Sequence, residues 1–216
     1  MTREIFQIYN RNLYSIIFLS ITIIFPITAL IFTAILYLNE INGLTSQTYI
    51  AGLLLLINFI LCAPPYLKLV LLDLQDEKMG WREGFQFFIK QFGPLFITSV
   101  ALYLTALYTM WLFLIPSILI LMYLLIIPYY SDVNSYKSMM KLAGSKLIDE
   151  NISVLIDLVI VISVSLLVWS GMMYLMQNFQ NNLYGYMLIR VILNIFTLPF
   201  IYIYLSLRYR SDQFSV

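Results

Sequence analysis

The sequence contains no histidine, and only one cysteine, among its 216 residues. It therefore lacks the commonest metal ligand and the commonest general base at neutral pH, and Cys62 alone cannot form an intramolecular disulfide. No P-loop, GxGxxG, HExxH or CxxC pattern occurs, and neither a Ser-His-Asp nor a Cys-His pair can be assembled. We expect no enzymatic activity, no catalytic residue, no cofactor and no metal site.

Charge is also scarce. Charged residues make up 11% of the chain and the net charge is +1, so no basic field predicts a nucleic-acid partner. Hydrophobic residues reach 62% and the mean hydropathy is +0.89, well above the roughly 45–50% apolar content of soluble domains. A soluble domain of this size cannot hide that much apolar surface from water. The composition predicts a single integral membrane domain, residues 1–216, with the lipid bilayer as its surroundings.

Six apolar stretches have about the length of a membrane-spanning helix, for which about 20 residues suffice. The uncharged run Pro94–Tyr130 is too long for one span and just long enough for two, with Pro116 in the first turn of the second. The first stretch is too long for the apolar region of a signal peptide. We therefore predict an all-α, polytopic transmembrane bundle with spans at residues 13–38, 49–72, 94–111, 115–130, 152–176 and 184–207.

The basic residues predict the orientation of these spans. Of the twelve Lys and Arg residues, all except Arg190 fall at the termini or in or beside the second and fourth connections. The positive-inside rule places that side in the cytoplasm. A single span over Pro94–Tyr130 would move Lys137, Lys141 and Lys146 outside, so the charge bias favours two. We expect a cell-membrane protein, in a bacterial plasma membrane, with both termini cytoplasmic.

The two longer cytoplasmic connections have helical periodicity. In each, apolar residues recur on one face and charged residues occupy the other, which predicts an amphipathic helix lying in the membrane interface. The first apolar face comprises Trp81, Phe85, Phe88, Ile89 and Phe92, and the second comprises Val133, Tyr136, Met140, Ala143 and Leu147.

A proline followed by an aromatic residue recurs in the cytoplasmic half of the second, fourth and sixth spans. The three pairs are Pro65-Tyr66, Pro128-Tyr129 and Pro199-Phe200. One interpretation is a helix-breaking motif in an internal parallel repeat. The alternative is that prolines are common in membrane helices and that aromatic residues collect at membrane interfaces.

Four polar residues lie within predicted spans, and they form the candidate intramembrane site: Asn58, Asp157, Arg190 and Asn194. Ionisable residues are costly in lipid and indicate functional positions. Asp157 and Arg190 lie near opposite ends of their spans, about 13 Å apart in depth, so a direct ion pair is disfavoured. Either each charge reaches its nearer interface, or both face a polar cavity or a lipid headgroup. For the asparagines, the alternative is interhelical hydrogen bonding.

Several segments resemble one membrane superfamily. They are Trp111–Ser117, Leu124–Tyr130, Met140–Leu147 and the ending Leu198-Pro-Phe200 followed by Tyr204 and Arg208. These resemble the membrane domain attached to some glycerophosphodiester phosphodiesterases and its stand-alone bacterial relatives, although Ser117 stands where that family often has glycine. The segment Pro64-Pro-Tyr66 with Trp81–Phe85 is similar to another six-span family, found near carbohydrate-uptake genes. Neither resemblance transfers a catalytic residue.

These observations leave two hypotheses for function. The first is a non-catalytic membrane protein that acts as a transport accessory or assembly partner, with another membrane protein, such as a transport complex, as its partner. The second is a small transporter or lipid-handling protein in which Asn58, Asp157, Arg190 and Asn194 line a polar cavity.

Overall fold

A computed structural model describes residues 2–40, 47–111, 113–133, 135–175 and 183–210. Every regular element in these ranges is helical, which confirms the predicted all-α class. In chain order the elements are α1 (Thr2–Arg11), α2 (Leu13–Leu19), the π-helical η1 (Ser20–Ile24), α3 (Phe25–Glu40), α4 (Gln47–Cys62), α5 (Pro64–Leu74), α6 (Trp81–Met110), α7 (Leu114–Ile126), the 3₁₀-helical η2 (Ile127–Tyr130), α8 (Tyr136–Asp149), α9 (Asn151–Leu175) and α10 (Leu183–Arg210).

Five helical stretches in these ranges are long and apolar enough to cross a membrane by length and composition. A further apolar helix, Leu114–Tyr130, is shorter than these five. The helices are thus compatible with a multi-pass membrane protein. The five long stretches are Leu13–Leu38, Gln47–Leu74, Trp81–Met110, Asn151–Tyr174 and Met187–Arg210.

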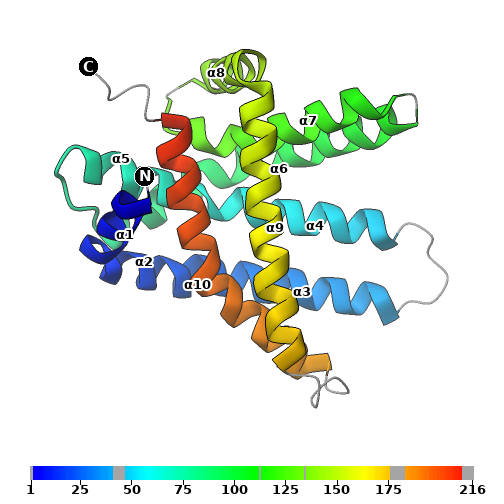
Figure 1. The fold of residues 1–216 in the computed structure, drawn as a ribbon, viewed down its shortest axis with the longest axis horizontal. Coiled ribbons are helices and arrows are strands. Elements are labelled where there is room, and N and C mark those ends of the chain that lie inside the picture. The colour runs from blue at the N-terminus through cyan, green and yellow to red at the C-terminus, as the bar shows by residue number, and fades with distance from the viewer. Residues whose placement is uncertain (1, 41–46, 112, 134, 176–182, 211–216) are drawn as a thin grey trace.

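The apolar helices form two groups rather than one parallel bundle. In Figure 1, α3, α4, α6 and α7 run side by side, whereas α9 and α10 cross them. Helix α10 packs against α1, α3 and α5, and α9 makes only sparse contacts with its neighbours. This crossing creates a junction where α3, α4, α9 and α10 meet.

Proline explains three irregularities of the helices. Pro26 has no backbone N–H to donate within its helix and its ring crowds the preceding turn, and the chain widens into the π-turn of η1 just before it. The second predicted span bends at Ala63, directly before Pro64 and Pro65. A similar change occurs at Pro128, where α7 tightens into η2.

The third proline-aromatic pair does not interrupt its helix, contrary to the helix-break prediction for that position. Helix α10 runs from Leu183 to Arg210 with Pro199 inside it. Phe200 stacks on Tyr9 of α1, with ring centroids 4.1 Å apart. Membrane helices tolerate proline where neighbouring helices compensate the lost backbone bond, and α1 packs on α10 here.

The first predicted interfacial helix is not a separate element. Helix α6 runs without a break from Trp81 to Met110 and carries Pro94 in its interior. The amphipathic segment is thus the first part of the third predicted span. Continuing the helix through Pro94 keeps the backbone groups on either side hydrogen-bonded, whereas a break would leave two helix ends to be capped.

The second predicted amphipathic helix is present as α8, with a different buried face. Met139, Ala143 and Leu147 are buried, whereas Tyr136 is half exposed. Helix α8 begins after Ser135, and the Ser131 hydroxyl donates to the Pro128 carbonyl before it. The predicted stripe was therefore partly wrong in register, and Val133 lies before the helix.

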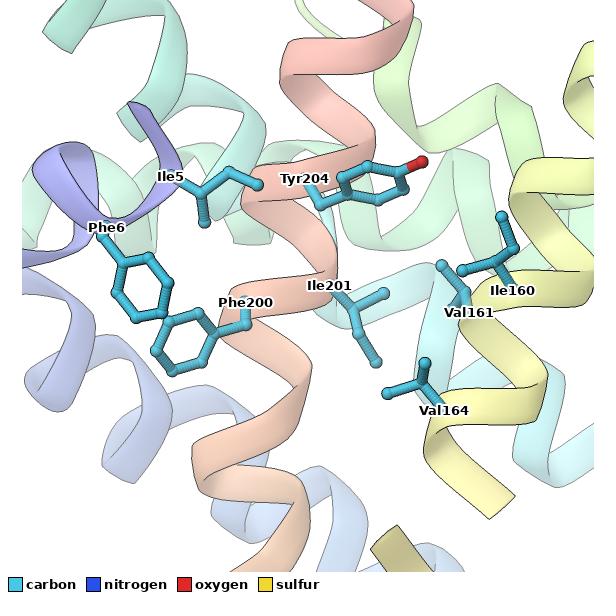
Figure 2. A pocket seen from close by; sticks show the side chains of 8 residues that line it. All are labelled: Ile5, Phe6, Ile160, Val161, Val164, Phe200, Ile201 and Tyr204. Atoms are coloured by element: carbon cyan, nitrogen blue, oxygen red, sulfur yellow. The ribbon is translucent and has the colours of Figure 1, made fainter. Parts of the chain in front are cut away.

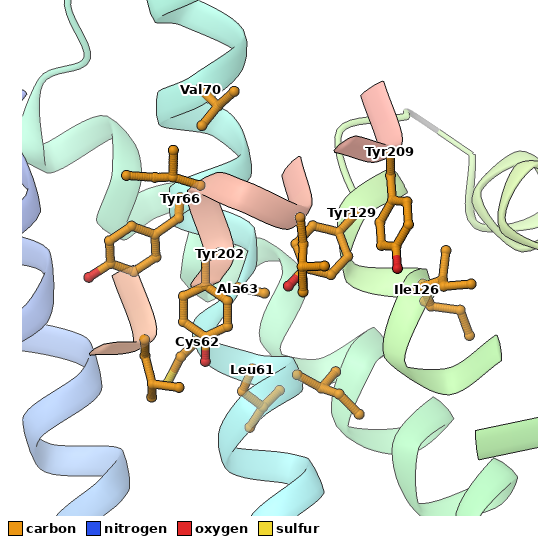
Figure 3. Packing of buried hydrophobic residues seen from close by; sticks show 14 of the residues in the cluster. Leu61, Cys62, Ala63, Tyr66, Val70, Ile126, Tyr129, Tyr202 and Tyr209 are labelled. Atoms are coloured by element: carbon orange, nitrogen blue, oxygen red, sulfur yellow. The ribbon is translucent and has the colours of Figure 1, made fainter. Parts of the chain in front are cut away.

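The best-packed part of the core is a row of tyrosines between α4–α5, η2 and α10 (Figure 3). Tyr66, Tyr129 and Tyr202 are fully buried. Tyr202 donates its hydroxyl proton to the Phe59 carbonyl over 2.9 Å, and the Tyr66 hydroxyl lies 2.9 Å from Ser20 Oγ in the π-turn. Two of the proline-aromatic pairs thus contribute their tyrosine to this core.

Ion pairs cluster beside this core, at the end of the molecule that carries α5, α8 and the last turn of α10. We call this region the charged end. Its pairs are Arg11–Asp73, Lys68–Glu83 (3.3 Å), Lys146–Glu150 (2.6 Å), Arg208–Asp157 (3.0 Å) and Arg210–Asp132 (2.5 Å).

Candidate functional site

A polar cavity of about 160 Å³ lies at the junction of α3, α4, α9 and α10. Asn58, Arg190 and Asn194, three of the four polar residues singled out in the sequence, line it together. We call it the junction cavity. Its lining comprises Phe32 of α3; Leu55, Asn58 and Phe59 of α4; Ser165, Val168 and Trp169 of α9; and Arg190, Leu193, Asn194, Thr197 and Leu198 of α10.

Helical spacing explains why these side chains converge. Residues three and four apart lie on the same face of a helix. On α10, Arg190, Asn194 and Thr197 stand at i, i+4 and i+7, and on α9 Ser165 and Trp169 stand at i and i+4. One stripe on each helix therefore faces the cavity.

Aromatic rings surround the Arg190 guanidinium. Its Cζ lies 4.0 Å from the centre of the Trp169 ring and 5.4 Å from that of Phe32. A cation over an aromatic face gains about 2 kcal/mol or more when desolvated.

The two asparagines differ in how they are held. Asn58 is buried, and its Oδ1 accepts a hydrogen bond of 3.1 Å from Thr28 Oγ1 on α3. That bond orients the amide and leaves its NH₂ group as the remaining hydrogen-bonding group. Asn194 is partly buried, and within the described part of the chain its side chain has no hydrogen-bond partner. Both amides can serve a ligand in the cavity.

The two hydroxyl groups of the lining are committed to their own helices. Ser165 Oγ donates to the Val161 carbonyl over 2.8 Å, and Thr197 Oγ1 donates to the Leu193 carbonyl over 2.9 Å. Neither proton is available to a ligand. The other polar groups of the lining are the Arg190 guanidinium and the two amides.

Asp157 lies elsewhere, at the charged end. It is 7% exposed and its Oδ2 accepts a bond of 3.0 Å from Arg208 Nε, while its Oδ1 accepts one of 2.8 Å from the Tyr204 hydroxyl. Arg208 also donates to Ser153. Asp157 thus joins α9 to α10 as a structural contact and is separate from the junction cavity.

The partner of Asp157 was not predicted, because the sixth predicted span ends at Leu207. Helix α10 continues to Arg210, so Arg208 belongs to the helix and pairs with α9. Trp169 and Phe32 were not predicted either, since aromatic residues are numerous throughout the chain. The i, i+4 spacing of Arg190 and Asn194 was the available signal that these two share a face.

A second hollow is an apolar groove between α1, α9 and α10 (Figure 2). Its volume is about 250 Å³. Tyr204 has the only hydroxyl group in its lining, and that hydroxyl donates to Asp157. Polar groups that fix a ligand's orientation are a mark of specific sites, so the junction cavity is the better candidate. The groove is lined by Ile5, Phe6, Ile160, Val161, Val164, Phe200, Ile201 and Tyr204.

A third hollow, of about 370 Å³, lies beside Asp73, Asp76 and Glu77 at the charged end. The Asp73 carboxylate already binds the Arg11 guanidinium and accepts a bond of 2.6 Å from Asn12 Nδ2. Among the described residues, no group of three or more side chains could hold a metal ion. Asp73 is therefore engaged in structural contacts.

No protein-family model, no curated protein and no solved structure matches this chain. The resemblance to the phosphodiesterase membrane-domain superfamily stays a prediction. The geometry of the junction cavity therefore carries the functional argument.

Proposed function

We propose that this chain is a non-catalytic, multi-pass membrane protein that binds a small solute or a lipid headgroup in the junction cavity. The observation that carries this proposal is the convergence of Asn58, Arg190 and Asn194 on one cavity from two helices. Polar side chains at such depth are costly in lipid. A protein that gathers three of them around an open volume of 160 Å³ has the means to hold a polar group within the membrane.

The proposal includes six spans with both termini in the cytoplasm. Helix α7 with η2, residues Leu114–Tyr130, supplies the shorter span, and the charged end faces the cytoplasm. Membrane helices tilt by up to about 40° from the bilayer normal. The two crossed groups of helices share one bilayer when they tilt in opposite senses.

Cysteine labelling tests the topology. Cys62 is fully buried, so the natural chain provides an unlabelled control. Cysteines at Asn42 and Asn181, which lie outside the described residues, are expected to react with an impermeant thiol reagent from outside the cell. A cysteine at Ser138 of α8 is expected to react only after the membrane is opened. Labelling of Ser138→Cys in intact cells would overturn the orientation.

Ligand binding is tested by extracting the protein in discs of native lipid and identifying the co-purifying molecules by mass spectrometry. We expect one solute or lipid class to be enriched over bulk membrane. The enrichment is expected to fall in Asn194→Leu, which changes the cavity wall without breaking a hydrogen bond. Thr105→Val, a polar-to-apolar change on the exposed face of α6, is the matched control. Equal enrichment with the natural chain, Asn194→Leu and Thr105→Val would contradict the proposal.

A second candidate function, a transport accessory or assembly partner, draws on helix α9. In the most apolar stretch of α9, 22% of the residues are buried. In the most apolar stretch of Gln47–Leu74, 56% are buried. A helix that packs so sparsely leaves a long face for another membrane protein. A stoichiometric membrane protein that co-purifies with the natural chain and is lost in Leu167→Trp would favour this candidate.

A further inference from the structure

We infer that the apolar groove between α1, α9 and α10 binds a phospholipid, with one acyl chain in the groove and the phosphate beside Arg208 and Arg3. The membrane location is taken from the proposed function, but the groove is a second site. Among the described residues, the groove and the junction cavity have no lining residue in common.

The lining of the groove suits a hydrocarbon chain. Figure 2 shows Val164 of α9 facing Ile201 of α10 across it. In the described part of the chain, Tyr204 has the only hydroxyl group of the lining, and that hydroxyl donates to Asp157. A stable water molecule needs two or more polar partners, which the groove does not offer. A hydrocarbon chain needs none and gains apolar contacts along the groove.

The volume and the direction of the groove also suit one acyl chain. The groove measures about 250 Å³, and a cavity of about 150 Å³ accommodates a six-carbon benzene ring, so a segment of one chain fits. Tyr204 lines the groove next to Asp157 at the charged end. Val164 lies seven residues after Asp157 on α9, about 10 Å further along the helix. A chain that enters beside Asp157 therefore runs away from the charged end and into the apolar part of the molecule.

Arg208 supplies a cation at the end of the groove nearest the charged end. Its Nε donates to Asp157 over 3.0 Å and its Nη2 donates to Ser153, whereas its Nη1 makes no hydrogen bond within the described part of the chain. The Glu150 carboxylate lies 4.0 Å from Nη2 and binds Lys146 over 2.6 Å. Arg208 is partly exposed, so Nη1 remains to donate a charge-assisted hydrogen bond to a phosphate oxygen.

Arg3 supplies a second cation from α1. It is exposed and lies three residues before Phe6, which lines the groove, and residues three apart share a helix face. Glu4 lies about 200° around the helix from Phe6, at about 100° per residue, and so faces away. Helix α1 packs on α10, and Figure 1 places the N-terminus toward the last turns of α10. Two guanidinium groups, whose geometry matches phosphate, therefore flank one end of the groove.

Quenching of tryptophan fluorescence by brominated lipid chains tests the site. The three natural tryptophans are replaced by phenylalanine, and one reporter is introduced, either Phe6→Trp in the groove or Ile162→Trp as the matched control. Ile162 is exposed and lies about 200° around α9 from Ile160 of the lining, so it faces away from the groove. Each protein is placed in phosphatidylcholine discs that contain a small fraction of phosphatidylglycerol or diacylglycerol with the same brominated chains.

We expect phosphatidylglycerol to quench Phe6→Trp about threefold or more strongly than diacylglycerol, as for one partly exposed charge-assisted contact. The two lipids are expected to quench Ile162→Trp equally. Arg3→Gln is expected to reduce the preference at Phe6→Trp. Lys137→Gln, at an exposed position of α8, is the control for charge and is expected to leave the preference unchanged.

Filling the groove provides a second measurement, which keeps the natural tryptophans. Val164→Phe places a ring in the groove. Val159→Phe is its matched control, at a similarly exposed position of α9 outside the lining. Native mass spectrometry of the detergent-solubilised proteins, titrated with phosphatidylglycerol, detects bound lipid. We expect the natural chain and Val159→Phe to retain a phospholipid that Val164→Phe loses.

Two results would overturn the inference. One is equal quenching of Phe6→Trp by phosphatidylglycerol and diacylglycerol, which would remove the phosphate contact. The other is retention of the phospholipid by Val164→Phe, which would place the lipid outside the groove. Neither result bears on the junction cavity. A phospholipid in the groove is expected on Asn194→Leu and Arg190→Leu alike, so it forms a constant background when binding in the junction cavity is measured.

Discussion

Helix α10 holds Arg190 and Arg208 in different surroundings. In its C-terminal half, Arg208 pairs with Asp157 of α9 at 3.0 Å. In its N-terminal half, the Arg190 guanidinium lies over the Trp169 ring, and Arg190 lines the junction cavity. A carboxylate binds the first arginine, whereas aromatic rings lie beside the second. We propose that Arg208 serves the structure and that Arg190 belongs to a binding site.

The largest expected effect is on the packing of the C-terminal half of α10. Tyr202→Ala removes a fully buried ring that contacts Phe59 and Tyr66, and it is expected to cost about 3–5 kcal/mol of unfolding free energy. Tyr184→Ala, at an exposed position near the N-terminal end of the same helix, is the control and is expected to change stability by less than about 0.5 kcal/mol. Unfolding by SDS in mixed micelles, followed by circular dichroism, measures both. Equal losses of unfolding free energy in the two variants would contradict the expected difference between the two halves of α10.

The next largest effect is expected from breaking the Asp157–Arg208 ion pair. Asp157→Ala leaves Arg208 and Tyr204 without their acceptor, and it is expected to cost about 1–3 kcal/mol, less than for a fully buried pair because about a third of the Arg208 side chain is exposed. Asp149→Ala, at an exposed position of α8, is the control. A double-mutant cycle with Arg208→Met is expected to give a coupling above about 0.5 kcal/mol. A coupling near zero would show that the contact contributes nothing.

Arg190→Leu is expected to change stability little. The loss of the cation–π contact, about 0.5–2 kcal/mol, is offset by the removal of a charge from the membrane interior, so the net change is expected to stay below about 1 kcal/mol. The same SDS titration measures it beside Asp157→Ala. A loss as large as that of Asp157→Ala would assign Arg190 a structural role and remove the contrast between the two arginines.

The smallest effect is expected on the outward face of α9. Leu167 is 71% exposed, and Leu167→Ala is expected to change the unfolding free energy by less than about 0.5 kcal/mol. Val154→Ala, at a fully buried position of the same helix, provides the comparison and is expected to lose about 1 kcal/mol or more. A larger loss at Leu167 than at Val154 would mean that α9 is packed in the membrane, by a partner chain or a second copy.

Length and hydropathy were sufficient to predict the helices, because a membrane span needs a long apolar run that few other structures produce. Helix boundaries were less predictable. The continuation of α6 through Pro94 depends on whether neighbours compensate a lost backbone bond, which a single sequence does not show. The crossing of α9 and α10 over the other helices depends on tertiary packing and has no periodicity that could predict it.

The candidate site was predictable in part. The polar residues within apolar runs include Asn58, Arg190 and Asn194. The free-energy cost of placing a polar side chain in lipid is the signal that identifies them. Asp157 stands out for the same reason but has a structural partner, and only the extra turn of α10 to Arg210 reveals that Arg208 reaches it. The same physical cost in lipid therefore marks both a candidate site residue and a structural one, and the sequence alone does not separate them.

Native mass spectrometry of three proteins tests the central claim most directly: the natural chain, Arg190→Leu and Asp157→Asn, each released from native-lipid discs at matched folded yield. The account predicts a bound small molecule or lipid on the natural chain, its retention on folded Asp157→Asn and its loss from Arg190→Leu. Retention of the same molecule on Arg190→Leu, or its loss from both variants alike, would contradict the assignment of binding to the junction cavity.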